Sequence, residues 1–209
     1  MRLSVLTLVS ASILSMGAAL AQAPAPVPAP APAAPQIRAA GTITAAEPGK
    51  VTLKTESGTA TVMIAATTRL SGATPGTSAD VKPGSYIGAG ARPQADGTLN
   101  AVQIYIFPEA QRGTGEGHRA WGVLPETTMT NATVEDAVSS VSAGILTLKY
   151  KDGEKKLRIV SDTAILVAGS ATAADLTVGT WINAVGTATP EGPLAAARVT
   201  IGLKGAKPI

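Results

Sequence analysis

The stretch VTLKTESGTATVMI at residues 51–64 returns 95 positions later as LTLKYKDGEKKLRI at residues 146–159. Both stretches alternate apolar and polar residues on either side of a glycine, which is typical of a β-hairpin with one buried face. The match extends without a gap from 41–106 to 136–201, and 18 of the 66 aligned pairs are identical. The sequence therefore predicts an internal duplication of one β unit.

Each repeat predicts an all-β fold, because period-2 apolar residues are separated by turns such as Pro48-Gly49. In the first repeat we expect strands at 37–46, 51–55, 59–65, 85–91 and 99–107. A small closed barrel is favoured over an open meander, since a meander of this size would leave two exposed edges. We therefore expect two tandem five- to six-stranded β-barrels of the OB or SH3 type, one per repeat.

Two finer features of the strands follow from the same alternation. Ser57-Gly58 and Asp152-Gly153 are expected to form two-residue hairpin loops. These loops would pair Leu53 with Val62 and Val51 with Ile64, and in the second repeat Leu148 with Leu157, Leu146 with Ile159 and Lys149 with Lys156. In the last strand the apolar phase changes between Ala196 and Val199, which predicts a β-bulge.

The N-terminal part of the chain predicts export. Residues 1–21 combine Arg2, an uncharged apolar stretch and Ala19-Leu20-Ala21, a pattern typical of a cleaved signal peptide, with an uncleaved membrane anchor as the alternative. A Pro/Ala-rich linker at 22–36 follows. We then expect a first β domain at 37–107, an ordered inter-domain segment at 108–134, a second β domain at 135–203 and a tail at 204–209. The expected location is periplasmic or secreted, with no membrane span in the mature chain.

Composition narrows the chemistry. The 209 residues include no Cys and one His, which excludes thiolate metal sites and disulfides and disfavours a His-based triad. Asp80 and Asp175 are the only acids conserved between the two repeats at matching positions, and we expect both to cap turns. The sequence thus predicts no enzyme and no cofactor. Nucleic acid is not expected as a partner, because aromatic residues make up only 3% of the chain.

The segment between the repeats contains the candidate ligand-binding residues. Three interpretations of it stay open: a structural clamp with Trp121 buried, a glycine-rich anion loop, and a metal site. For a metal site, one His with two Glu offers too few ligands for structural zinc. The candidates are Glu109, Arg112, Glu116, His118, Arg119 and Trp121.

The tandem β units and the run from Phe107-Pro-Glu through Arg112-Gly-Thr-Gly-Glu-Gly-His-Arg119 to Trp121 and Met129-Thr-Asn131 resemble an uncharacterised family of exported proteobacterial proteins. Some members carry the label "metal ABC transporter permease". The resemblance implies a secreted β fold without assigned chemistry. The label does not suit this sequence, since a permease needs several membrane helices.

Taken together, these patterns predict an exported, periplasmic, non-enzymatic binding protein or envelope-associated structural protein of unknown ligand. Its partner would be an unknown protein or another component of the envelope. The alternative is a periplasmic accessory protein that binds a metal ion or small anion through the loop at 109–121.

Overall fold

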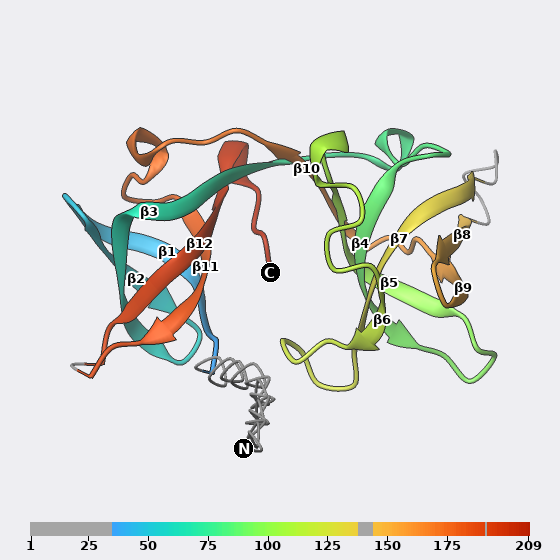
Figure 1. The fold of residues 1–209 in the computed structure, drawn as a ribbon, viewed down its shortest axis with the longest axis horizontal. Helices are drawn as coiled ribbons and strands as arrows, with labels where there is room; N and C mark the ends of the chain where they lie inside the picture. Colours follow the sequence, from blue (N-terminus) through green and yellow to red (C-terminus); the bar gives the residue numbers. More distant parts are fainter. Residues whose placement is uncertain (1–34, 138–143, 191) are drawn as a thin grey trace, which may run out of the picture. The chain divides into compact units, whose positions relative to one another are not determined.

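The computed structural model describes residues 35–137, 144–190 and 192–209, and nearly all of its regular structure is β (Figure 1). The expected signal peptide and all but the last two residues of the expected linker lie outside the described residues. No described helix is long and apolar enough to cross a membrane. The strands are β1 (Ile37–Glu47), β2 (Lys50–Thr55), β3 (Gly58–Pro75), β4 (Tyr86–Pro93), β5 (Leu99–Ile106), β6 (Gly117–Ala120), β7 (Thr128–Ala137), β8 (Ile145–Tyr150), β9 (Gly153–Arg158), β10 (Ala164–Gly169), β11 (Trp181–Ala188) and β12 (Leu194–Gly202).

Strands from the two ends of the chain close one five-stranded barrel, here called the terminal barrel. Its pairings run β1-β2-β3-β12-β11 and return to β1, with β3 parallel to β12 and the other neighbours antiparallel. The alternation seen in the sequence places one face of each strand inside. The resulting core contains Ile43, Val51, Leu53, Val62, Ile182, Ala184, Leu194, Ala196, Val199 and Ile201.

Strands from the middle of the chain form a second ring, here called the central barrel. Its pairings run β5-β4-β7-β8-β9 and return to β5 through Leu99 opposite Leu157 and Asn100 opposite Arg158. β6 pairs with β7, and β10 lies parallel to β5. The buried side chains include Ile87, Leu99, Ile104, Val134, Leu146, Leu148 and Leu157.

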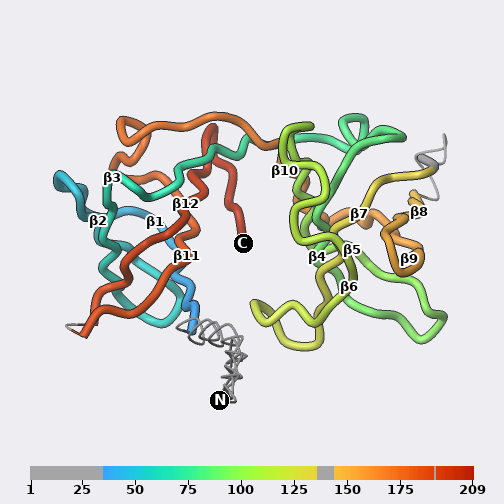
Figure 2. Tube along the Cα trace, in the orientation of Figure 1, coloured from blue at the N-terminus to red at the C-terminus, as the bar shows by residue number. Residues whose placement is uncertain are grey.

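The expectation that each repeat closes its own barrel is not confirmed, because both cores draw strands from both repeats. The first repeat gives β1–β3 to the terminal barrel and β4–β5 to the central barrel. Figure 2 shows the same division, with blue and red segments together and green and yellow segments together. The physical reason lies in β3, which stays extended to Pro75 and pairs there with β10. The expected boundaries at 37–107 and 135–203 remain a prediction about the repeats, and they do not coincide with the two cores.

The hairpin register differs from the expected one by two residues. Val51 lies opposite Val62 and Leu146 opposite Leu157, while Lys149 faces Glu154 instead of Lys156. The turns are formed one residue earlier than expected, so that Gly58 and Gly153 open strands β3 and β9, at φ of 131° and 151°. A shift of two residues keeps the same side chains on the same face. The buried face was therefore predicted correctly although the register was wrong.

Two other expectations are confirmed. The register of β12 shifts between Ala196 and Arg198, which leaves Ala197 as the bulged residue of that strand. The expected turn caps are also present. Asp80 Oδ2 accepts hydrogen bonds from the backbone N–H of Thr77 at 2.7 Å and from its hydroxyl at 2.9 Å. Asp175 makes the same two bonds with Thr172, at 2.8 Å and 3.1 Å.

Candidate functional site

The segment at 107–131 packs onto the outer face of β4 through aromatic side chains. The Phe107 ring lies 5.0 Å from that of Tyr105 and 5.5 Å from that of Tyr86, measured between ring centroids. Trp121 is only 7% exposed, as expected, and lies directly over Gly90. A Cβ atom added to Gly90 would come within 2.2 Å of the Trp121 ring. The absence of a side chain at Gly90 therefore creates the space that the indole fills.

The charged candidates of this segment bond to the protein itself. Arg112 forms an ion pair with Glu109, donates to the carbonyl oxygen of Gly84 at 2.7 Å, and lies 5.9 Å from the centre of the Tyr86 ring. The hydrogen bonds from Arg112 lower the pKa of the Glu109 carboxyl. Such a pair fixes the loop in place and leaves little of the guanidinium free for a ligand.

The remaining charged candidates are used in the same way. Arg119 donates to the carbonyl oxygen of Gly115 at 2.8 Å, and Glu116 accepts from the backbone N–H of Lys151 at 2.9 Å. The described residues contain no group of three or more His, Asp or Glu side chains that could hold a metal ion. The six predicted site residues thus lie on one segment, but neither of the two cavities described below includes any of them.

His118 lies against the buried hydroxyl of Thr130, with its Nδ1 at 2.8 Å from Oγ1. Partial burial, with a smaller contribution from the charge of Lys155, lowers the pKa of the imidazole. The fold therefore favours the neutral form of His118.

This shift predicts a pH dependence of stability. Because the pKa of His118 is lower in the folded chain, the unfolded chain binds the proton more readily as the pH falls below about 6.5, the ordinary His value. We expect stability to fall from there until the lower folded pKa is reached. Urea unfolding at pH 7.5 and pH 5.5 should show a larger loss in the parent than in His118→Gln. Equal losses in the two proteins would contradict the assignment.

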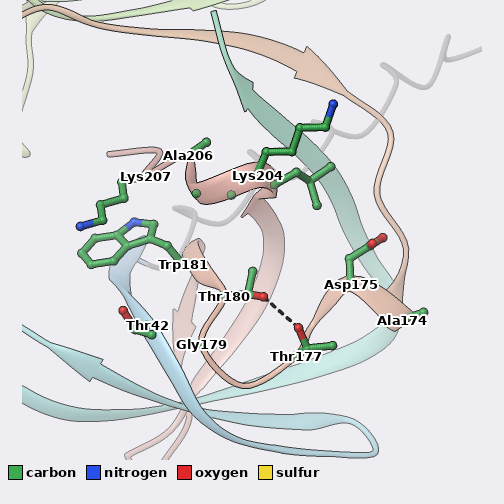
Figure 3. Close-up of a pocket in the computed structure, with 13 residues that line it drawn as sticks. Thr42, Ala174, Asp175, Thr177, Gly179, Thr180, Trp181, Lys204, Ala206 and Lys207 are labelled. Atoms are coloured by element: carbon green, nitrogen blue, oxygen red, sulfur yellow. Dashed lines mark hydrogen bonds between the residues drawn. The ribbon is translucent and has the colours of Figure 1, made fainter.

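A cavity of about 340 Å³ opens beside Trp181 on the terminal barrel (Figure 3). Its wall combines the indole with threonine hydroxyls, small apolar side chains and two lysines. In Figure 3, Lys207 lies beside the indole and Asp175 lies on the opposite side of the opening. The lining residues are Thr42, Ala174, Asp175, Thr177, Gly179, Thr180, Trp181, Gly202, Leu203, Lys204, Gly205, Ala206 and Lys207.

A tight turn after β12 builds one wall of this cavity. Lys204 and Gly205 both have positive φ, 51° and 81°. Gly202 has no room for a side chain, because an added Cβ would lie 1.9 Å from the carbonyl oxygen of Ala206. Beyond this turn the Trp181 Nε1–H, at the start of β11, donates to the carbonyl oxygen of Pro208 at 3.1 Å. The turn therefore brings the last residues of the chain against the indole.

The charges around the cavity are unbalanced. Lys207 Nζ lies 5.7 Å from the centre of the Trp181 ring, in a cation–π arrangement. Among the residues that the structure describes, no ion pair includes Lys204 or Lys207. The carboxylate of Asp175 is bonded to Thr172. The residues around the cavity therefore include two lysines, one indole and threonine hydroxyls, of which those of Thr177 and Thr180 bond to each other at 3.0 Å. Such a composition suits a small anion with an apolar part.

Sequence reasoning missed this cavity because its walls come from three separate parts of the chain, at Thr42, 174–181 and 202–207. Lys204 and Lys207 fall in the expected tail at 204–209, and Trp181 was not among the candidate residues. The available signal was the spacing Lys204-Gly205-Ala206-Lys207 in a chain with only two Trp. A second cavity, of about 500 Å³, lies at one end of the terminal barrel, and its wall includes Ile64, Leu70 and Leu176.

The comparisons with known proteins returned no match to a family model, to a curated protein or to a solved structure. The resemblance noted in the sequence therefore stays an expectation.

Proposed function

We propose that the protein is an exported, non-enzymatic binding module of the periplasm that takes a small anionic ligand in the cavity beside Trp181. The cavity carries this proposal. It joins an aromatic wall to Lys204 and Lys207, neither of which has an acidic partner among the described residues. Its volume of about 340 Å³ suits a ligand of modest size, at the lower end of known binding pockets.

We also propose that the terminal barrel is of the OB type and that it arose with the duplication. The circuit β1-β2-β3-β12-β11, with β3 parallel to β12, is the strand order of an OB-type barrel in which the last two strands come from the other repeat. The duplication is supported by matching details 95 residues apart. These are the caps at Asp80 and Asp175 and the bulged residues Val102 and Ala197.

Fluorescence of Trp181 offers a direct test of the ligand site. In a Trp121→Phe background Trp181 is the only indole, so its emission reports the cavity alone. We expect phenyl phosphate to give a saturable change at constant ionic strength, and the change to disappear in Lys204→Gln/Lys207→Gln. The control, Lys151→Gln/Lys156→Gln, removes the same charge on the exposed turn and edge of the β8–β9 hairpin and should leave the change intact.

The alternative function makes a different prediction. If the loop at 109–121 binds the ligand, binding of phosphate or of a divalent metal, measured by calorimetry, should disappear in His118→Ala and survive in Lys204→Gln/Lys207→Gln. The cavity proposal fails if phenyl phosphate gives no saturable change or if the double lysine variant retains it.

A further inference from the structure

The net positive charge of the chain lies in the segments that build the terminal barrel. Residues 35–75 and 170–209 contain seven Lys and Arg against four Asp and Glu, whereas residues 76–169 contain nine against ten. The excess of the whole chain beyond Arg2 therefore lies in the parts that build the terminal barrel. A partner drawn by charge would approach this barrel first.

Three arginines of the terminal barrel form one row across its outer face. Arg38 of β1 lies opposite Val185 of β11, Val185 lies opposite Arg198 of β12, and Arg198 lies opposite Arg69 of β3. The residues next to them along the strands, Ala184 and Val199, belong to the core. All three arginines are exposed. With neighbouring strands about 4.8 Å apart, the row is about 15 Å long.

No acid neutralises the row within the described part of the chain, where the ion pairs involve other residues. Although much of the Arg38 side chain is exposed, desolvation by its surroundings, together with the charge of Arg198, lowers the pKa of its guanidinium. Like charges on neighbouring strands are destabilising. The bulge at Ala197 lies directly before Arg198, and a bulge changes the direction in which the next side chain points. The arginines of the row therefore repel one another, and an anionic partner would relieve this repulsion.

The central barrel provides an internal comparison. Its corresponding row is Met129, Gly90, Gln103 and Ala164, read from the pairings of β7, β4, β5 and β10. This row has no charge, and Trp121 covers it at Gly90. The same strand geometry therefore forms without arginines, which means that the fold does not require them.

We propose that the row of Arg38, Arg198 and Arg69 docks the terminal barrel onto the phosphate groups of an anionic lipid surface. The row lies outside both cavities, on an open sheet face, which suits a surface that presents many phosphates side by side. No aromatic residue occupies the row, so the stacking expected of a single-stranded nucleic acid site is missing there. This proposal does not depend on the cavity beside Trp181, and it is tested by a separate experiment.

Vesicle co-sedimentation tests the proposal on the chain from residue 22 onward, since residues 34–209 form a compact unit of their own. At 50 mM NaCl we expect binding to vesicles of equal parts phosphatidylglycerol and phosphatidylcholine, and none to phosphatidylcholine alone. Three basic residues near such a surface together account for about two orders of magnitude in affinity, so R38Q/R69Q/R198Q should lower the affinity about a hundredfold. Binding should also weaken at 500 mM NaCl.

The control is K151Q/K155Q/K156Q, which removes three charges from the central barrel and should leave vesicle binding nearly unchanged. Equal binding to both vesicle types, or an equal loss in the two triple variants, would overturn the proposal. So would arginine-dependent binding to soluble polyphosphate or an oligonucleotide without binding to vesicles. If the triple variant fails to fold, the single variants R38Q, R69Q and R198Q give the same readout, each with a partial loss.

Discussion

Two separate pieces of this chain, residues 35–113 and 114–209, are expected to assemble into one complex when they are produced together. The first piece carries β1–β5 and the second carries β6–β12, so each barrel takes strands from both pieces. Without its partner, the first piece would lose Ile182, Val199 and Ile201 from the core of the terminal barrel. Each buried side chain of this size contributes about 1.5–3 kcal/mol, and neither core can spare several of them.

Size-exclusion chromatography with light scattering would identify the complex. We expect a 1:1 assembly from the two pieces and no stable monomer from either piece alone, by circular dichroism and urea unfolding. The control is the unbroken chain from residue 35, which should elute at nearly the same volume as the complex. A piece that unfolds cooperatively as a monomer would contradict the shared cores and would restore the expectation of one barrel per repeat.

Trp121→Ala is expected to lower the free energy of unfolding by about 3–5 kcal/mol, the range for removing a large buried aromatic side chain. The indole is 7% exposed and covers Gly90, which cannot fill the space that the ring would leave. Urea unfolding followed by circular dichroism measures the loss. Trp121→Phe, which keeps an aromatic ring, should cost clearly less.

A double-mutant cycle tests the contact itself. Gly90→Ala places a methyl group where the indole lies and should destabilise the parent protein. In the Trp121→Ala background the same methyl group enters an empty space, so the cost should be much smaller or reversed. Strictly additive effects would mean that the segment at 107–131 does not depend on this contact.

Local pattern was sufficient to predict most strands of the first repeat and the buried faces of the two hairpins, although the strand expected at 59–65 continues to Pro75. The expected strand at 99–107 is found at Leu99–Ile106, and the one at 85–91 at Tyr86–Pro93. The bulge in β12 and the caps at Asp80 and Asp175 were also predicted, because each depends on residues close together in the sequence. The hairpin register was not predicted correctly. A shift of two residues buries the same face, so the alternation of apolar and polar residues does not distinguish the two registers.

Thus the sequence by itself determined the all-β class, the bounds of most strands in the first repeat, the inward face of the two hairpins and the burial of Trp121. Only the tertiary structure decided which strands share a core. Two similar repeats present similar strand edges, so the pattern of β3 suits a partner from either repeat. In the structure β3 pairs with β12 and, towards Pro75, with β10, both from the second repeat. The same long-range pairing brings Arg38, Arg198 and Arg69 into one row and Trp181 beside Lys207, because strand neighbours distant in sequence are set by packing rather than by local propensity.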